Sequence, residues 1–287
     1  MGNVLHDKIS ILALSVFNST FAPDKRDKHL YMTRVDETLF EGAHYLGRPA
    51  DHTDKIITRR AEVVKQIPGF CDKNLRLLEI GCGNGATLLL MSKEMKECLG
   101  VDIYEGHKKV FEEIKAEQGI INCNVVIKNV EEQDLFDGNT GTEKFDRLIC
   151  FEVIEHFNDD QHVKRFTQWL KPGALCAISV PNKWWIFETH GARLPLLPWN
   201  RVPLFSWLPK FIHERYANAR IYTRPRIRRL LEENGFEVLD MQLITAPMDV
   251  LKDGALKRFL VKNVFGNNTT SVPFLSTSIF ITAKVKG

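Results

Sequence analysis

The sequence predicts an α/β protein with a mostly parallel β-sheet and helices on both faces. Short runs of aliphatic and β-branched residues alternate with helical stretches from residue 75 onward, and parallel strands need such helical crossovers. A glycine-rich turn directly follows the first of these runs, as at the ligand-binding edges of parallel sheets. With 287 residues, 44% of them hydrophobic, the chain is long enough to bury a core without disulfides or metals.

The spacing of apolar residues indicates where the elements lie. Runs such as LRLLEI and ALCAISV have the length and composition of buried strands, whereas apolar residues three or four apart indicate amphipathic helices. Pro225 and Gly235 mark the beginning and end of the last helix in this series. We expect strands at residues 75–80, 98–103, 124–130, 145–152, 174–180, 236–244 and 276–285, and helices at residues 55–66, 86–95, 106–119, 159–170 and 223–234.

Three segments lie outside this alternation. Residues 1–54 are expected to form an N-terminal helical extension, because apolar residues recur at helical spacing over residues 4–21. Residues 55–287 then form one domain. It contains an aromatic and basic insert at about 183–222 and a second insert at about 247–266, which we expect to be an amphipathic helix.

Charge and cysteine content exclude several classes of protein. The 39 Lys and Arg residues against 36 Asp and Glu give a net charge of +3, too small a surplus for nucleic-acid binding by the whole chain. Six cysteines occur without a CxxC pair, which argues against a zinc finger and a disulfide framework. Free cysteines in apolar runs are typical of a reducing compartment, and we find neither a signal peptide nor a spanning segment. We therefore expect a cytoplasmic protein.

The strongest motif is a strand that runs straight into a glycine-rich turn. Gly81, Gly83 and Gly85 fall within five residues, so the backbone there can approach a ligand closely. Asp102 ends the next strand about 20 residues later, where a carboxylate can accept hydrogen bonds from both hydroxyls of a ribose. Together they predict an adenosine-containing ligand.

Five motifs follow one another along the chain: Glu79-x-Gly81-x-Gly83-x-Gly85, Val101-Asp102, Asn129-Val130-Glu131, Phe145-Asp146 leading to Glu155-His156, and Leu170-Lys171-Pro172-Gly173-Ala174. In this order they resemble the motifs of class I S-adenosylmethionine-dependent methyltransferases. The match covers roughly residues 55–245, and this core is similar to the ubiquinone-pathway O-methyltransferases. The resemblance implies a Rossmann-like, seven-stranded sheet and S-adenosylmethionine (SAM) as the cofactor.

The resemblance also assigns cofactor contacts to the strand ends. It implies that the glycine loop packs on the amino-acid part of SAM, that Glu79 organises this loop, and that Asp102 holds the ribose. Ile103 and the segment starting at Asn129, where the family often has Asp, would contact adenine, and Phe151 would lie beside the methionine moiety. The cofactor residues implied are Glu79, Gly81, Cys82, Gly83, Gly85, Asp102, Ile103, Asn129, Val130, Glu131 and Phe151.

His156 follows the fourth strand, where a general base for an oxygen acceptor would stand. It is therefore our candidate catalytic residue. A second interpretation makes it a metal ligand: Glu152, Glu155 and His156 have i, i+3, i+4 spacing, and His190 could add a ligand from the first insert. The ExxEH string resembles the metal-binding motif of small-RNA 3′-terminal 2′-O-methyltransferases, which would imply a divalent ion such as Mg²⁺.

The first insert combines aromatic and basic residues. Residues 183–229 hold ten Lys and Arg against two Glu, and four of the five tryptophans of the chain lie there. Its apolar run LPLLPWNRVPLFSWLPKF favours a lipophilic acceptor and contact with an anionic membrane over stacked nucleic-acid bases. The candidate substrate residues are Trp184, Trp185, His190, Arg220 and Tyr222.

The sequence thus predicts a SAM-dependent methyltransferase that acts on the oxygen of a lipophilic small molecule, such as a prenylated aromatic, near a membrane surface. Two alternatives remain open. One is a metal-dependent RNA ribose 2′-O-methyltransferase, and the other is a non-catalytic module that binds SAM or a membrane. The sequence identifies neither the acceptor molecule nor the oligomeric state.

Overall fold

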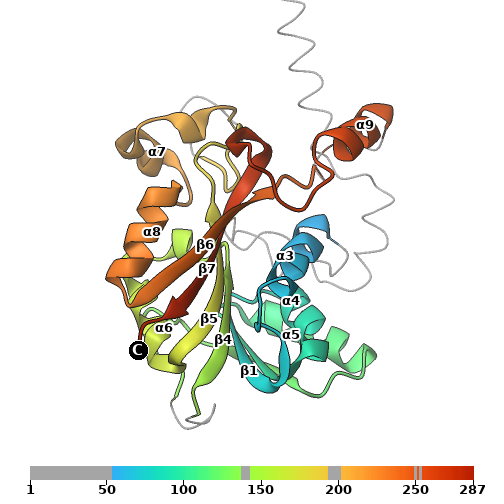
Figure 1. Ribbon diagram of the computed structural model, residues 1–287, viewed down its shortest axis with the longest axis vertical. Helices are drawn as coiled ribbons and strands as arrows, with labels where there is room; N and C mark the ends of the chain where they lie inside the picture. The colour runs from blue at the N-terminus through green and yellow to red at the C-terminus, as the bar shows by residue number, and fades with distance from the viewer. Residues whose placement is uncertain (1–53, 137–142, 193–201, 249–250, 252–253) are drawn as a thin grey trace, which may run out of the picture.

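The computed structural model describes residues 54–136, 143–192, 202–248, 251 and 254–287. They form one sheet with helices on both sides (Figure 1). The strands are β1 (Asp72–Ile80), β2 (Met95–Asp102), β3 (Cys123–Ile127), β4 (Phe145–Phe151), β5 (Leu170–Pro181), β6 (Phe236–Thr245) and β7 (Ser276–Val285). The α-helices are α3 (Lys55–Lys65), α4 (Ala86–Met91), α5 (Glu105–Glu117), α6 (Phe166–Trp169), α7 (Lys210–Tyr216), α8 (Arg224–Glu233) and α9 (Ala255–Asn263), and the 3₁₀ turns are η2 (Ser92–Glu94), η3 (Ile154–His156), η4 (Asp160–Arg165), η5 (Phe205–Trp207) and η6 (Pro273–Leu275).

The seven strands lie in the order β3-β2-β1-β4-β5-β7-β6. The first five in this order are parallel to one another, whereas β7 runs antiparallel to both β5 and β6. Because β1 and β4 are adjacent and parallel, their carboxyl ends meet at one edge of the sheet. The predicted seven-stranded, mostly parallel α/β fold is therefore confirmed.

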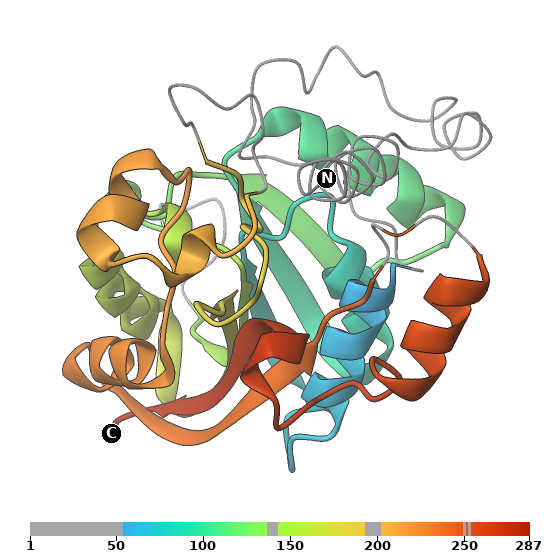
Figure 2. The same ribbon diagram turned by 90° about the horizontal axis from the view of Figure 1, so that it is seen from above.

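The sheet is buried on both faces, because successive strand side chains point to opposite sides. Leu78 belongs to a core cluster that also contains Trp169 of α6 and Ile227 of α8. Its neighbour Leu77 belongs to a second cluster, with residues such as Phe111 of α5. Figures 1 and 2 show the same layers: α6 and α8 cover one face, and α3, α4 and α5 cover the other.

Two predicted helices are shorter than their apolar spacing suggested. The stretch 86–95 is α4 followed by η2, and Met95 already begins β2. The stretch 159–170 is η4 followed by the single turn α6, and Leu170 begins β5. In both cases, the apolar residues nearest the next strand are drawn into the sheet, where they are buried.

The two inserts pack against each other. Trp185, from the first insert, forms a small core with Ala246 and Phe265, and Leu260 of α9 packs against it. The second insert contains a helix, α9, as expected, although none of its residues is fully buried. The predicted N-terminal helix at 4–21 lies outside the described residues, as does Trp199.

All six cysteines are free thiols, and five of them are buried. Among the described residues, no helix has the length and hydrophobicity needed to span a membrane.

Candidate functional site

The glycine loop connects β1 to α4 in a conformation that needs glycine. Gly81, Gly83 and Gly85 all have positive φ angles, of 68°, 54° and 73°. A side chain at Gly81 would also overlap the methyl groups of Val153, which follows β4. The loop therefore lies against the end of β4, with its backbone open to close approach by a ligand.

Asp102, at the end of β2, is tied to the glycine loop. One carboxylate oxygen accepts from the backbone N–H of Gly83 at 2.8 Å. The other accepts from the backbone N–H of Tyr104 at 3.0 Å and lies 3.1 Å from His107 Nδ1. Asp102 is 8% exposed, so its carboxylate is held at the edge of the sheet in one orientation.

Other predicted cofactor residues surround this edge. Glu79 is buried beneath the loop and hydrogen-bonds to the backbone of Leu88 in α4, and burial raises its pKa well above the usual range. Cys82 is also buried, whereas Ile103 is 56% exposed and offers an apolar surface. Phe151, half-buried at the end of β4, packs against Phe280 with ring centroids 5.8 Å apart.

The segment after β3 is held by its own side chains. Asn129 Oδ1 accepts from the backbone N–H of Glu131 at 3.0 Å. The Glu131 carboxylate in turn binds the backbone N–H of Asn158 and lies 2.7 Å from His162 Nδ1. Val130 is buried. The side chain of Glu131 therefore fixes the segment that follows β4.

Glu152 does not join the ligand group that its spacing predicted. It has a positive φ of 57° at the end of β4. Its Oε1 accepts from Arg60 at 2.8 Å and from Ser179 Oγ at 2.9 Å. Three ligands at i, i+3 and i+4 spacing share one face only if a helical turn begins at Glu152. The 3₁₀ turn starts only at Ile154, and the Glu152 carboxylate is turned toward α3.

Arg60 is a site residue that the sequence analysis missed. It projects from α3, is buried, and also donates to Ser278 Oγ at 3.0 Å. Its Nε has no hydrogen-bond partner among the described residues. The signal was present in the sequence: Arg59 and Arg60 precede Ala61, Val63 and Val64, which are all buried, and paired arginines on a buried helix face require anionic or carbonyl partners.

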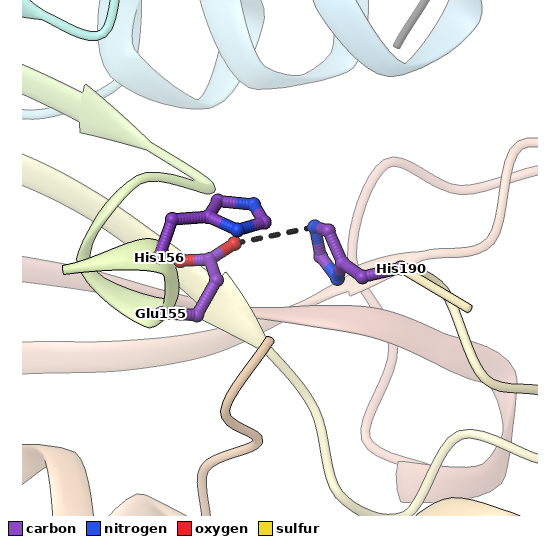
Figure 3. A group of neighbouring side chains, drawn as sticks. All are labelled: Glu155, His156 and His190. Atoms are coloured by element: carbon purple, nitrogen blue, oxygen red, sulfur yellow. Dashed lines mark ion pairs between the residues drawn. The ribbon is translucent and has the colours of Figure 1, made fainter. Parts of the chain in front are cut away.

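Glu155, His156 and His190 form a compact group (Figure 3). Each offers one ligand atom, and these atoms lie within 4.8 Å of one another. His190 Nε2 is 3.4 Å from Glu155 Oε1, and the two imidazole centroids are 4.9 Å apart. The first insert thus places His190 beside the turn that follows β4, as the sequence suggested.

Burial changes the protonation of this group. Glu155 is completely buried, and neither of its oxygens has a hydrogen-bond partner among the described residues. Burial raises the pKa of Glu155 well above the usual range, and the neighbouring Glu152 adds to this effect. Burial, together with the charge of His190, lowers the pKa of His156 to about 4. A cation that enters the group would therefore meet His156 as a neutral imidazole and would compete with a proton for Glu155.

The predicted substrate residues divide into exposed and buried sets. Trp184 is 42% exposed, whereas Trp185 is 8% exposed because it packs in the core between the inserts. Arg220 donates to the backbone carbonyls of Phe157 and Asn158. Arg220 and Trp185 thus fix the insert in place, while Trp184 remains open to a ligand.

The burial of Tyr222 argues against the predicted contact with the acceptor. The backbone at Tyr222 extends the end of β5 by pairing with Asn182. This pairing directs the side chain into the main core, where it is fully buried and its hydroxyl donates to Asp160 at 3.2 Å. The spacing of residues in the sequence cannot reveal that Tyr222 points into the core, because its direction depends on pairing with Asn182, which is distant in the sequence.

Comparison with known proteins gives the same picture. A family model described as a methyltransferase domain matches residues 52–241. A ubiquinone biosynthesis O-methyltransferase of Bartonella tribocorum is 29% identical over 172 residues, which cover 58% of this chain and 62% of that protein. The enzyme of the same name from Ruegeria pomeroyi is 29% identical over 191 residues, or 62% and 70% of the two chains. The match to the Bartonella protein thus spans less than two thirds of its length.

The fold also occurs among solved structures. A putative methyltransferase, solved in complex with the Trm112 methyltransferase activator of Haloferax volcanii, aligns with a TM-score of 0.54 at 14% identity, over 93% of this chain and 100% of that one. At this identity the likeness establishes the fold alone. The glycine loop, Asp102 and the sheet order agree with this family. Because the family model also covers more than half of the chain, the chain belongs to the family of SAM-dependent methyltransferases.

Proposed function

We propose that the chain transfers a methyl group from SAM to a hydroxyl oxygen of a lipophilic small molecule. The observation that carries this proposal is the position of Glu155, His156 and His190, at the same edge of the sheet as the glycine loop. The names of the O-methyltransferase relatives support an oxygen acceptor. The aromatic insert beside this group supports a lipophilic acceptor.

The cofactor is proposed to lie across the carboxyl ends of β1, β2 and β4. The glycine loop would contact its amino-acid part, and Asp102, held by the backbone of Gly83 and Tyr104, would accept from the ribose hydroxyls with its remaining lone pairs. The exposed side chain of Ile103 would cover one face of adenine. Arg60, with an unpartnered Nε, would balance the carboxylate of the methionine moiety.

The reaction is a direct in-line displacement. The acceptor oxygen attacks the methyl carbon, so that a C–O bond forms while the C–S bond of the sulfonium breaks. The products are the methylated acceptor, S-adenosylhomocysteine and the proton of the hydroxyl. The protein contributes alignment of the two reactants and a place for the proton.

The pKa of His156 favours its role as a ligand over its role as an unaided base. A phenolic hydroxyl has a pKa of about 10, whereas burial lowers the pKa of His156 to about 4. Proton transfer between them is uphill by about six units, or about 8 kcal/mol. A neutral imidazole at pH 7 is, however, well suited to bind a metal ion.

The residues present fit a divalent cation. A buried carboxylate without a hydrogen-bond partner, Glu155, faces the nitrogens of His156 and His190. Two imidazoles and one carboxylate suit Mn²⁺, Fe²⁺ or Zn²⁺ better than Mg²⁺, which prefers oxygen ligands. When bound, such an ion would act as a Lewis acid that lowers the pKa of the acceptor hydroxyl.

We further propose that the insert meets an anionic membrane surface. Trp184 contacts Trp207, and Trp207 contacts Phe274, with ring centroids 6.3 and 5.4 Å apart. All three side chains are partly exposed. Lys210 and Arg215 of α7 are exposed in the same insert, and basic residues beside aromatic ones are typical of interfacial segments.

Titration calorimetry of SAM into metal-free protein tests the cofactor site. We expect micromolar binding, which Asp102→Ala abolishes because the ribose loses its acceptor. Repeating the titration with Mn²⁺ and with Mg²⁺ tests the cation, and a screen that starts with polyprenylated phenols tests the acceptor. Absence of SAM binding under all these conditions would contradict the proposed function.

The RNA ribose 2′-O-methyltransferase remains the second candidate, because Glu155 and His156 of the ExxEH segment cluster with His190 of the insert. Methylation of a 3′-terminal RNA oligonucleotide, with no turnover of prenylated phenols, would favour it. SAM binding without turnover of either acceptor would favour the non-catalytic module.

A further inference from the structure

A buried polar unit lies in the insert behind His190. Glu188 Oε2 accepts from Ser206 Oγ at 3.1 Å and lies 2.7 Å from His213 Nε2. The side chains of Glu188 and His213 are both fully buried. Ser206 belongs to η5 and His213 to α7, so a single carboxylate joins three parts of the insert.

The second oxygen of the same carboxylate holds His190. Glu188 Oε1 accepts from the backbone N–H of His190 at 3.2 Å. Asn218 Nδ2 donates to the carbonyl oxygen of His190 at 3.0 Å, and Thr189 Oγ1 lies 2.9 Å from His190 Nδ1. The peptide is thus fixed on both sides and one ring nitrogen is engaged, which leaves Nε2 toward Glu155.

Stability alone does not account for this arrangement. A buried carboxylate is costly to desolvate, and apolar residues of similar volume often give equal or greater stability. What the polar unit adds is a single geometry, because each hydrogen bond fixes a direction as well as a distance. The hydrogen bonds of Glu188 fix the position of the His190 backbone in this way.

We propose that Glu188, His213 and Ser206 form a positioning unit that sets His190 at the Glu155 and His156 group, so that folding of α7 and assembly of the site are coupled. The proposal rests on the proposed function for the role of His190. Positioning groups behind a ligand are commonly worth a factor of 10 to 100 in metal affinity or activity.

The chain offers a matched control on the same helix. Glu214 of α7 lies 2.8 Å from Arg226 of α8, and both side chains are 25% exposed. This pair anchors α7 without contacting residues 188–190. Glu214→Gln therefore loosens the helix. His213→Leu removes the contact with Glu188 and replaces the imidazole with an apolar side chain of similar size. His213→Gln retains a donor at the position of Nε2 and serves as the rescue variant.

The experiment uses the full chain and two readouts besides activity. The first is the pair of imidazole ¹⁵N shifts of His190 in metal-free protein, assigned with His190→Gln, which report its tautomer. The second is the visible absorption of Co²⁺ during titration. We expect His213→Leu to give His190 mixed tautomers and to weaken Co²⁺ binding about tenfold or more. His213→Gln and Glu214→Gln should remain close to wild type.

The outcomes separate this proposal from the proposed function. Unchanged His190 shifts in His213→Leu, or equal effects of His213→Leu and Glu214→Gln, would overturn the positioning role. If wild type binds no Co²⁺, the proposed cation site is refuted. The tautomer measurement alone then decides whether His213 positions His190. If His213→Leu does not fold, Ser206→Ala takes its place, with a smaller shift of His190 expected and no change as the refuting result. SAM binding should persist in every variant.

Discussion

At the scale of single residues, backbone and packing both exclude a side chain at Gly81. A left-handed backbone costs an ordinary residue about 1–2 kcal/mol, and overlap with Val153 adds about 1–3 kcal/mol. We expect Gly81→Ala to lower the free energy of unfolding by the sum of the two and to abolish SAM binding. Gly83→Ala should lose only the backbone contribution, because no atom lies within 4 Å of the added carbon. Denaturant unfolding of both variants tests whether Gly81→Ala loses more unfolding free energy than Gly83→Ala. Equal losses would contradict this expectation.

His156 gives the protein a pH dependence of stability. Its pKa is lowered from 6.5 to about 4, so between these pH values the unfolded state binds more protons than the folded state. The free energy of unfolding therefore falls as the pH decreases from 6.5 to 4, by about 3 kcal/mol from this residue. The raised pKa of Glu155 acts in the opposite direction.

The difference between wild type and His156→Asn isolates the contribution of His156. Denaturation in metal-free buffer at several pH values should show a flatter profile for the variant between pH 4 and 6.5. Parallel profiles for the two proteins would mean that His156 is solvated in the folded state.

Residue types and motifs predicted which residues lie at the carboxyl edge of the sheet, but not the direction of each side chain. Asp102 and the glycines lie where the motifs placed them, because strand ends and tight turns are local features. His190 reaches Glu155 from 35 positions away in the sequence, and only its residue type hinted at this. Tyr222 and Glu152 depend on pairing with distant segments, which no local pattern encodes.

At the scale of elements, two adjacent tryptophans in the insert have opposite roles. Trp185 packs with Phe265 and Ala246, so Trp185→Ala should destabilise the insert by about 3–5 kcal/mol. Trp184 is exposed, so Trp184→Ala should leave thermal stability unchanged and reduce sedimentation with anionic liposomes severalfold. Calorimetry and liposome sedimentation of both variants test this. Equal liposome binding by wild type and Trp184→Ala would remove this tryptophan from the proposed membrane contact.

Element positions were predicted better than element types. The strands begin and end within a few residues of their expected bounds, because buried strands are continuous apolar runs. The stretch 159–170 has helical spacing and contains the single turn α6, yet half of it is 3₁₀. The helix ends at Trp169 because Leu170 is buried as the first residue of β5, and this tertiary contact outweighs helix propensity.

At the scale of the whole molecule, the sheet depends on its last strand. Ile281 of β7 pairs with Ile178 of β5 on one side and with Met241 of β6 on the other. Proline there would remove a backbone donor from the middle of the sheet, so we expect Ile281→Pro to give no cooperatively folded protein. Ile281→Val should lose only about 0.5–1.5 kcal/mol. Circular dichroism during heating checks both, and a cooperative transition in Ile281→Pro would contradict the expectation.

The position of β7 also sets an order of events during synthesis. The ribosome delivers the chain from its N-terminus, so β1 to β5 are available to pair before β6 emerges. Within the described part of the chain, the ladder partner of β6 is β7, and 30 residues separate Thr245 from Ser276, including the insert with α9. Until those residues are made, β6 has an unpaired backbone edge. The boundary between β5 and β6 is therefore the last seam of the sheet to close, and a nascent chain that pauses within the α9 insert exposes an edge to which other chains can add.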